Sequence, residues 1–575
     1  MSRPTMTQAA RPFDVEVIIV TYRSDVADLE RLIATLETQQ SRPFRLRVTL
    51  VDNTADPAYF ARLEGVAAGA ARSLAMEAMA SPRNVGFGSA VNRVLKEKDA
   101  RYVLLLNPDA YLAPDALWEL ARSMEGDERA AAWEMRQSPY EHPKIYDPVT
   151  LETPWVSTAA VLYRREALDA IGGFDEKIFL YGEDVDVSWR LRCRGWLLRY
   201  VPRSVAIHRT YQYPGEVKAQ QVLGGTLTNL CLRARFARWR RVAGGVRLML
   251  NEIGQPDKFP GRRRGLIANL LKFSLLLPRF RIGPWRNIPG FEPYFVRWDY
   301  APHRDGAFFE FREPGAWKDG PLVSILIRTH RRPHWLRQAL QTVRNQTYPN
   351  IEAVVVEDGE PISKDMVERE FAGTMNVRYA ATGERVGRSH AGNLAMSMAK
   401  GEWLNFLDDD DALFADHVEV MVSEALRLEV KGVYGIALET PTRVLSTDPL
   451  RYEEVEPFVR YRQHFSRLVL WHHDFIPIQA LLFHRSLFER NGGFDEAMDQ
   501  LEDWNLWTRY TLEEDFALVE KTTSKYRVPA DRTAAQERQA GLDAAYAGAI
   551  ERQASMRLAV TPREVMRWLA QHERR

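Results

Sequence analysis

The first patterned segment of the chain is Val15–Thr21, a continuous apolar run rich in β-branched residues. Such a run predicts a strand that is buried on both faces of a sheet. Residues 25–39 follow with apolar positions three and four apart, which predicts a helix with one face against that sheet. Val48–Asp52 and Tyr102–Leu106 are the next predicted strands.

The second half of the chain repeats this plan. Val323–Ile327, Glu352–Glu357 and Trp403–Leu407 have the composition of buried strands. A helix is predicted after the first of them, because its apolar positions recur at helical spacing. Strands that alternate with helices form mostly parallel sheets covered on both faces, so we predict an α/β fold built twice. The helical positions are Leu336, Leu340 and Val343.

A signature that occurs twice supports a duplication. Gly-Gly-Phe-Asp-Glu stands at 172–176 and again at 492–496, and each copy is followed by a Glu-Asp pair. Upstream of each copy, three predicted strands end in polar residues in the same order. Order and spacing are preserved, which indicates a duplicated module rather than chance matches. The ends of such strands are where open α/β sheets bind ligands.

The repeat divides the chain into four parts. The two modules are predicted at 14–210 and 319–530, and a largely helical, basic linker at 211–318 joins them. Within the linker, Gly224–Leu250 has the pattern of a basic helix. The Ala-, Gln- and Arg-rich segment 531–575 is predicted to be helical.

Composition excludes several classes of protein. A chain of 575 residues exceeds what one hydrophobic core usually supports. The net charge of +1 gives no reason to expect nucleic acid as a partner, and two cysteines suit a reducing cytosol. The N-terminal residues lack the apolar region of a signal peptide, and the longest apolar stretch, Gly265–Pro278, is too short to span a bilayer. We therefore expect a cytoplasmic protein, soluble or attached peripherally to the inner face of a membrane.

The densest chemical signal is the run of four aspartates at 408–411, directly after a predicted strand. Four ionised carboxylates repel one another, so a cation or solvent has to compensate them. Mg²⁺ or Mn²⁺ suits oxygen ligands and bridges to phosphates, which makes the run a candidate metal site. A solvated acidic turn is the alternative. The repeated position of the run favours the metal.

The first module has Asn107 and a single carboxylate, Asp109, at the matching place. Asn107 can hydrogen-bond a sugar hydroxyl, and Asp109 can bind a metal. His208 is a candidate second ligand, because imidazole suits Mn²⁺ better than Mg²⁺. A lone histidine is more often structural, so both interpretations stay open.

The Glu-Asp pairs, Glu183-Asp184 and Glu502-Asp503, lie where amphipathic helices are predicted to begin. Acidic residues favour the N-terminal end of a helix dipole, which is one explanation for them. The other is that one carboxylate of each pair faces a cleft and takes a proton from an attacking hydroxyl. Because each pair follows the duplicated signature, we favour the second.

Glycine-containing turns precede the third strand of each module. Arg83, Asn84 and Gly86 form one turn and Arg385 begins the other. Glycine lets the backbone approach a ligand closely, and arginine neutralises a diphosphate. This signal alone is weak, and neither a Walker A motif nor a Rossmann glycine fingerprint is present.

Together these motifs resemble the family 2 glycosyltransferases, which have the GT-A fold. The resemblance implies two GT-A modules that transfer a sugar from a nucleotide diphosphosugar to an acceptor hydroxyl, with inversion and with Mg²⁺ or Mn²⁺. It further implies general bases at Asp184 and Asp503 and metal ligands at Asp109 and Asp410. The nucleotide pocket would be formed by Thr21, Tyr22, Asp52 or Asn53, Thr329, His330, Glu357 and Asp358, and Asp408 and Asp409 would contact the nucleotide sugar.

The first module is most similar to bacterial rhamnosyltransferases that use dTDP-L-rhamnose, and the second to enzymes that build O-antigen and other surface glycans. Two departures stand out. Asn53 replaces an aspartate that many members have, and the second module has Lys525–Val528 where a histidine is expected. The implied acceptor is a polyprenol-diphosphate-linked glycan.

The sequence leaves three questions open. The first alternative to two active modules is an enzyme in which one module is a scaffold or an acceptor-binding domain. The second is a protein that binds carbohydrate without catalysis, although the duplicated acidic clusters argue against it. The basic segment 211–318 either contacts an anionic membrane surface or packs between the modules. A nucleotidyltransferase would show a glycine-rich signature with Arg and Lys, which neither module has.

Overall fold

The computed structural model describes residues 14–39, 43–70, 73–211, 213, 215–312 and 316–572. The chain divides into two compact units. Unit 1 holds the described residues up to His303, apart from Pro148–Thr150, together with Ala307–Glu310. Unit 2 holds Pro148–Thr150, Arg304–Gly306 and the described residues from Phe311 onward. A few positions of the predicted segments 211–318 and 531–575 lie outside the described residues.

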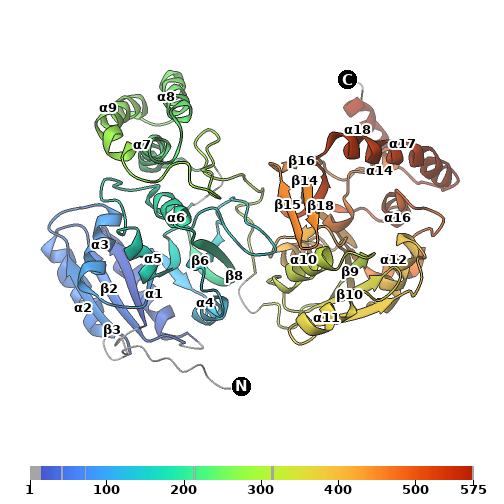
Figure 1. The fold of residues 1–575 in the computed structure, drawn as a ribbon, viewed down its shortest axis with the longest axis horizontal. Helices are drawn as coiled ribbons and strands as arrows, with labels where there is room; N and C mark the ends of the chain where they lie inside the picture. The colour runs from blue at the N-terminus through green and yellow to red at the C-terminus, as the bar shows by residue number, and fades with distance from the viewer. Residues whose placement is uncertain are drawn as a thin grey trace. The chain divides into compact units, whose positions relative to one another are not determined.

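Unit 1 is built on one eight-stranded sheet of order β3-β2-β1-β4-β7-β6-β8-β5 (Figure 1). β3, β2, β1 and β4 run parallel, and β7 pairs antiparallel with both β4 and β6. The predicted parallel sheet is thus found in the first half, and the sheet is mixed beyond β4, where the regular strand–helix alternation ends. Its strands are β1 (Val15–Thr21), β2 (Leu46–Asp52), β3 (Ala75–Ala80), β4 (Tyr102–Leu106), β5 (Ala110–Leu112), β6 (Ala130–Pro139), β7 (Ala160–Arg164) and β8 (Leu197–His208).

Helices cover both faces of this sheet. α1, α2 and α4 contribute to one buried cluster, and α3, α5 and α6 to a second cluster that the opposite side chains of the strands complete. Val17 and Ile19 of β1 belong to the first cluster and Ile18 to the second, because successive strand residues point to opposite faces. The helices are α1 (Val26–Glu37), α2 (Pro57–Ala70), α3 (Phe87–Glu97), α4 (Ala116–Met124), α5 (Arg165–Ala170) and α6 (Glu183–Cys193).

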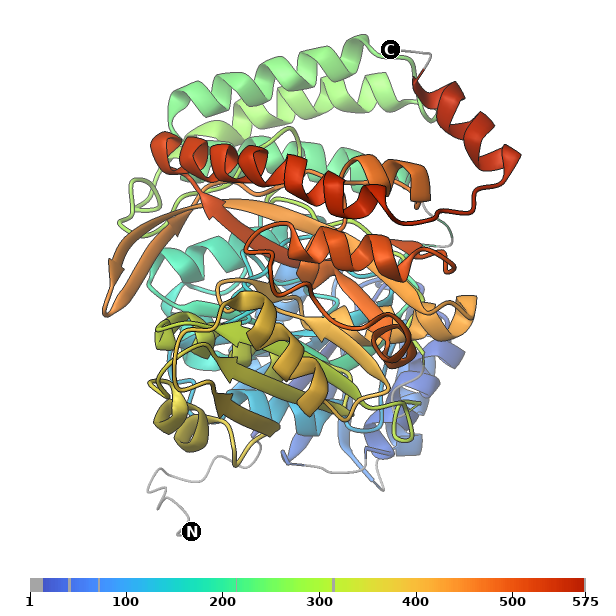
Figure 2. The same ribbon diagram turned by 90° about the vertical axis from the view of Figure 1, so that its right-hand side faces the viewer.

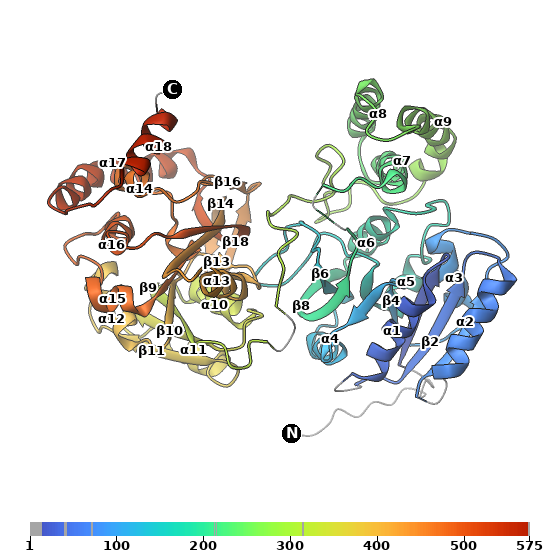
Figure 3. The same cartoon turned by 180° about the vertical axis from the view of Figure 1, so that it is seen from behind.

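Three further helices pack against α6: α7 (Ala219–Phe236), α8 (Trp239–Gly254) and α9 (Arg262–Arg281). Figures 1 and 3 show them as one group beside α6. They share a core with Val185 and Trp189 of α6. The single basic helix predicted at Gly224–Leu250 is wrong, because the chain breaks into α7 and α8 at Ala237 and Arg238, which have extended backbone angles.

Unit 2 repeats the strand order as β11-β10-β9-β12-β17-β14-β18-β13, so the duplication predicted from the sequence is confirmed. β15 and β16 are additions that pair with β14, and Figure 2 shows the β14–β15 hairpin, in orange, extending beyond the other strands of this sheet. Its strands are β9 (Val323–Thr329), β10 (Ile351–Glu357), β11 (Asn376–Ala381), β12 (Trp403–Phe406), β13 (Ala412–Leu413), β14 (Gly432–Thr447), β15 (Leu450–Glu454), β16 (Phe458–Val459), β17 (Leu481–His484) and β18 (Ala517–Pro529).

The helical C-terminal segment is confirmed. Asp531 caps the first of its two helices by accepting bonds from the amides of Thr533 and Ala534, both at 3.0 Å. The ring of Tyr546 stacks on that of Trp504 with centroids 5.4 Å apart. The unit 2 helices are α10 (Pro333–Arg344), α11 (Lys364–Glu370), α12 (Arg388–Met398), α13 (His417–Leu428), α14 (Arg467–His472), α15 (Arg485–Asn491), α16 (Glu502–Tyr510), α17 (Arg532–Ala554) and α18 (Pro562–His572), and a 3₁₀ turn lies at Ile478–Ala480.

Among the residues that the structure describes, no helix is both long enough and apolar enough to cross a membrane.

Candidate active sites

The polar strand ends of unit 1 meet at one edge of the sheet. Thr21 ends β1 and lies in register with Asp52 at the end of β2. The Thr21 hydroxyl donates to the carbonyl of Val51 at 3.0 Å, and Asp52 accepts from the amide and hydroxyl of Thr54. Thr329 and Glu357 occupy the same registered positions in unit 2. The sequence prediction that these residues share a sheet edge is confirmed, whereas their contact with a nucleotide stays a prediction.

Asn53 in unit 1 and Asp358 in unit 2 make equivalent hydrogen bonds to the backbone of a glycine turn. Asn53 accepts from the amide of Val85 at 3.0 Å and donates to the side chain of Asn84 at 3.1 Å. Asp358 accepts from the amides of Val386 at 2.6 Å and Gly387 at 3.1 Å. Each side chain therefore fixes the glycine turn that the sequence singled out.

The turns require their glycines. Gly86 has φ +85° and Gly387 has φ +99°, and a side chain at either is strained. A Cβ on Gly86 would also stand 2.7 Å from the carbonyl oxygen of Phe179. The turn is thus pressed against the loop that leads into α6. Several other predicted pocket residues extend toward solvent, namely Tyr22, Arg83 and Arg385.

The duplicated Gly-Gly-Phe-Asp-Glu signature is anchored by equivalent contacts in the two units. Asn92 of α3 exchanges two bonds with the backbone of Phe174, both at 2.9 Å. Asn393 of α12 holds Phe494 in the same way, at 2.7 and 3.0 Å. The aspartate of each signature forms an ion pair with an arginine of an added helix. Asp175 pairs with Arg235 of α7, and Asp495 pairs with Arg552 of α17.

Asp184 and Asp503 have matching surroundings in the first turns of α6 and α16. Each is half-buried and accepts a bond from the amide of the next residue, at 2.8 Å for Asp184 and 2.9 Å for Asp503. Burial raises the pKa of Asp184 to about 6. Burial, together with the charge of Glu502, raises the pKa of Asp503 to about 7. A carboxylate with such a pKa suits a general base near neutral pH.

The glutamates of the two pairs differ. Glu502 accepts a bond from Arg328 at 2.9 Å, and the same arginine donates to Asp408 at 2.8 Å. Val20 stands at the position of Arg328 in unit 1, next to the last residue of the first strand. Burial, followed by the charge of Asp184, raises the pKa of Glu183 to about 8. This shift favours the protonated form of Glu183.

Asn107, Asp109 and His208 come together although β8 lies far along the chain. Nε2 of His208 is 3.3 Å from a carboxylate oxygen of Asp109 and 3.2 Å from the amide nitrogen of Asn107. The other ring nitrogen faces Gln137 at 2.9 Å. Burial opposes ionisation of Asp109, but the hydrogen bond and charge of His208 outweigh it and lower the pKa.

The acidic run of unit 2 is compensated by arginines that the sequence interpretation missed. Arg332 reaches Asp409 at 3.2 Å and Asp410 at 3.0 Å. Thr329 donates to Asp409 at 2.7 Å. Burial and then the neighbouring Asp410 raise the pKa of Asp409 to about 7. The one sequence signal for these cations is Arg328, a charged residue inside an otherwise apolar strand.

The His208 position differs in unit 2. In unit 1, Ala110 of β5, the residue after Asp109, pairs with His208 of β8. In unit 2, Ala412 of β13 pairs with Lys525 of β18. The residue after Asp410 is Asp411, and the same antiparallel register places it opposite Tyr526, which therefore stands where unit 1 has His208. The Tyr526 hydroxyl donates to Glu439 at 2.8 Å.

Among the described residues, no three His, Cys, Asp or Glu side chains gather as a ready metal site. Unit 1 still offers a carboxylate and an imidazole side by side at Asp109 and His208. This donor set fits Mn²⁺ or Mg²⁺ of the kind held by one or two protein ligands together with substrate phosphates. In unit 2 the matching carboxylate, Asp410, shares Arg332 with Asp409, so guanidinium already compensates its charge.

Two further ionisable groups interact electrostatically with the proposed bases. In unit 1, Lys144 is buried, lies 2.6 Å from Glu134, and its charge opposes the rise in the pKa of Asp184. In unit 2, burial and then the charge of Asp503 raise the pKa of Asp474. From the sequence, Asp474 stands before the second signature together with His472 and His473, where these residues either face the acceptor or are structural.

A family model described as glycosyl transferase family 2 matches residues 16–175 and 324–491. The chain belongs to glycosyl transferase family 2. A second model, glycosyl transferase family group 2, matches residues 102–300, which includes the three added helices of unit 1. The duplicated modules are thus two copies of the family 2 domain, and the two mixed sheets with flanking helices have the GT-A architecture that the sequence predicted.

Known relatives of this family 2 protein resemble part of it. An uncharacterized glycosyltransferase of Rickettsia typhi is 27% identical over 33% of this chain and 58% of its own length. An N-acetylglucosaminyl-diphospho-decaprenol L-rhamnosyltransferase of Mycobacterium tuberculosis is 27% identical over 28% of this chain and 67% of its own. TarS (residues 1–349) of S. aureus is a solved structure with 14% identity and a TM-score of 0.31, over 36% of this chain and 60% of that one.

Proposed function

We propose that this protein is a bifunctional, inverting glycosyltransferase with one active site in each unit. The observation that carries the proposal is the matched placement of Asp184 and Asp503. Both aspartates are half-buried in the first turn of a helix, and each accepts a hydrogen bond from the amide of the next residue. The sheets of the two units have the same strand order. Duplicated geometry around the proposed base supports two working sites.

The reaction is a direct displacement. The acceptor oxygen attacks the anomeric carbon, the bond from that carbon to the diphosphate oxygen breaks, and the acceptor proton passes to Asp184 or Asp503. The raised pKa of each aspartate favours proton uptake near neutral pH. Glu183 and Glu502 support the bases from the start of the same helices, and Arg328 holds Glu502 in place.

The diphosphate of the donor would lie over the strand ends. In unit 1, Asp109 and His208 would hold a divalent cation, which supplies positive charge to the departing diphosphate. In unit 2, Asp410 is the proposed ligand, and Arg328 and Arg332 provide fixed positive charge beside it. Thr21, Asp52, Asn53 and their unit 2 counterparts are proposed to surround the nucleobase, with the glycine turns behind them.

For the substrates we propose dTDP-L-rhamnose as the donor of unit 1 and a polyprenol-diphosphate-linked glycan as the acceptor, in the assembly of a bacterial surface polysaccharide such as O-antigen. The M. tuberculosis relative, named as a rhamnosyltransferase that acts on a decaprenol diphosphate, supports this choice. This chemistry would take place on the cytoplasmic side of the inner membrane.

A second candidate is a single-activity enzyme in which unit 2 is a scaffold or acceptor-binding domain. The pairing of Arg328 with Asp408 and of Arg332 with Asp409 and Asp410 favours it, because the guanidinium groups occupy the acidic run.

A nucleotide-release screen separates the two candidates. The full chain is incubated with Mn²⁺ or Mg²⁺ and a panel of dTDP-, UDP- and GDP-sugars, beside the variants Asp184→Asn and Asp503→Asn. Release from two donors, each lost in a different variant, is expected. Release from one donor that only Asp184→Asn removes would establish the single-activity enzyme. No release from any donor, with or without added glycan acceptor, contradicts both.

A further inference from the structure

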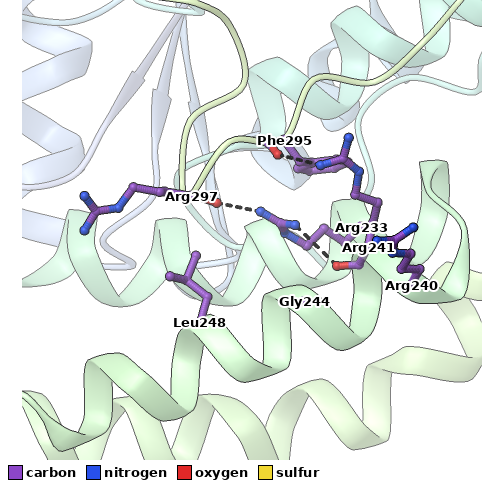
Figure 4. A pocket seen from close by; sticks show the side chains of 7 residues that line it. All are labelled: Arg233, Arg240, Arg241, Gly244, Leu248, Phe295 and Arg297. Carbon is purple, nitrogen blue, oxygen red and sulfur yellow. Dashed lines mark hydrogen bonds between the residues drawn. The ribbon is translucent and has the colours of Figure 1, made fainter.

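Unit 1 contains a cavity of about 570 Å³ between α7, α8 and the segment that carries Phe295 and Arg297. It lies outside the strand-end site. Arginines dominate its lining, and Figure 4 shows three of them, Arg233, Arg240 and Arg241, on one side, with the side chain of Arg297 directed away from them. The remaining lining residues are Gly244, Leu248 and Phe295.

Backbone carbonyls and an amide, rather than carboxylates, hold the arginines of this cavity in place. Arg233 is 4% exposed and donates to the side chain of Asn229 at 2.7 Å and to the carbonyl of Arg241 at 3.3 Å. Arg241 donates to the carbonyl of Phe295 at 3.3 Å. None of the cavity's lining residues carries a carboxylate. Burial, with the charge of Arg241, lowers the pKa of Arg233 to about 10, so the charge remains at neutral pH.

The buried charge of Arg233, with the exposed charges of Arg240 and Arg241 beside it, costs free energy that a bound anion would offset. Guanidinium groups bind phosphate oxygens through two parallel hydrogen bonds, which makes a phosphate or diphosphate the best-suited anion. Gly244 leaves room for it, because a Cβ there would have no heavy atom within 4 Å.

The cavity adjoins α6, the helix that carries the proposed base of unit 1 in its first turn. Phe295, which lines the cavity, packs its ring on that of Trp189 of α6 with centroids 5.1 Å apart, and the ring of Tyr300 packs on the same tryptophan at 5.6 Å. Burial raises the pKa of Tyr300, the negative charge of Asp184 raises it further, and the positive charge of Arg233 opposes the rise. In addition, Thr228 of α7 contacts Gly182, directly before Glu183, because a Cβ on Gly182 would stand 2.6 Å from the Thr228 methyl.

We propose that this arginine cavity binds the diphosphate group of the acceptor and so presents the acceptor hydroxyl to Asp184. The identity of the ligand as an acceptor rests on the proposed function. The existence of an anion site in this cavity does not depend on it. The diphosphate is carried by a lipid. The helix α9 supports this source, because it exposes an apolar stripe at i, i+4 spacing: Ile267 is 46% exposed, Leu271 66% and Leu275 82%.

The site is tested by calorimetric titration of the full chain with inorganic pyrophosphate in the presence of EDTA, so that no divalent cation recruits it to the strand ends. The double variant Arg240→Gln, Arg241→Gln removes two exposed charges without touching the core. We expect it to weaken binding by about tenfold or more, since each lost charge-assisted hydrogen bond is worth at least that factor. Gly244→Leu fills the cavity without changing the charge, and the same weakening is expected.

Arg247→Gln is the matched control, because Arg247 is an exposed arginine of α8 that does not line the cavity. Near-UV and far-UV circular dichroism of each variant reports whether the fold is kept. Equal pyrophosphate affinity in the wild type, the double variant and Gly244→Leu, or no binding by the wild type, overturns the proposal.

The source of the diphosphate is tested by flotation with phosphatidylcholine vesicles that contain a polyprenyl diphosphate. Flotation of the wild type and its loss in the double variant supports a lipid-linked diphosphate. Pyrophosphate binding without flotation overturns the lipid source and leaves a site for a free phosphate compound. Donor cleavage in the nucleotide-release screen is measured without lipid, so failure of the proposed function shows there, and failure of the anion site shows only in the titration.

Discussion

The Nε2 atom of His208, at the end of β8, lies 3.3 Å from the carboxylate of Asp109, which follows β4. β5 brings them together, because its first residue, Ala110, pairs directly with His208. The contact joins the two residues for which the sequence proposed metal binding in unit 1. In unit 2 the equivalent place belongs to Tyr526, so the two proposed sites differ in the side chains that would face a donor diphosphate.

This difference predicts different dependence on divalent cations. We expect EDTA to abolish the transfer that Asp184→Asn removes, and His208→Gln to raise the Mn²⁺ concentration for half-maximal rate by about tenfold, as loss of one imidazole ligand weakens the site. Initial rates across a Mn²⁺ titration measure this. Tyr526→Phe is the matched control in unit 2 and should leave the unit 1 titration unchanged. An unaltered Mn²⁺ requirement in His208→Gln would assign that histidine a purely structural role.

The raised pKa values of the two aspartates predict separate pH profiles. A general base works in its ionised form, so each rate rises with pH through the pKa of its own aspartate. The midpoint is expected near pH 6 for the transfer assigned to Asp184 and near pH 7 for that assigned to Asp503. Measuring kcat/KM for each donor across this range checks the order. Identical profiles for the two donors would contradict the assignment.

Arg328 is expected to be a stability residue as well as a site residue. Its guanidinium is buried and bridges Glu502 and Asp408, so Arg328→Met leaves the buried carboxylate of Glu502 with only the distant contact of Arg388 at 4.0 Å. The expected loss is about 3–5 kcal/mol of unfolding free energy in unit 2. Thermal and denaturant unfolding measure it. Arg332→Gln is the control, because that side chain is 52% exposed and should cost less than about 1 kcal/mol. Equal small losses for the two variants would contradict a stabilising role for Arg328.

Gly86 offers a test of the donor turn. Gly86→Ala places a Cβ 2.7 Å from the Phe179 carbonyl at a positive φ, so we expect a loss of about 1–3 kcal/mol and a higher KM for the unit 1 donor. Gly65→Ala is the matched control. Gly65 lies inside α2 with open space around its Cβ, and the substitution should stabilise the protein by roughly 0.5–1 kcal/mol. Chemical denaturation of both variants decides between the two signs.

Much of each module could be predicted because its signals are local. The apolar run of β1 and the helical stripe of α1 lie in consecutive residues, and both elements form where their periodicity indicates. The antiparallel half of each sheet had no such signal. β7 follows a long irregular segment rather than a helix, and its place between β4 and β6 is set by contacts distant in sequence.

The candidate sites also combine residues that local motifs identified with residues that only the folded structure brought to them. Motif order identified the Glu-Asp pairs and the acidic run, since each follows a predicted element at fixed spacing. The pairing of these carboxylates with cations was not predictable, because Arg328 and Arg332 contact residues distant in sequence and Lys144 acts from a loop; the sequence showed only that Arg328 is a charged residue in an apolar strand.

The sequence by itself determined that a family 2 glycosyltransferase module is present twice, because the repeated strand ends and signatures are properties of short segments. Only the tertiary structure decided how each site is charged. Whether a carboxylate is ionised, paired with arginine or placed beside histidine depends on burial and on through-space contacts. Those are set when distant strands and the added helices of unit 1 pack around the sheet.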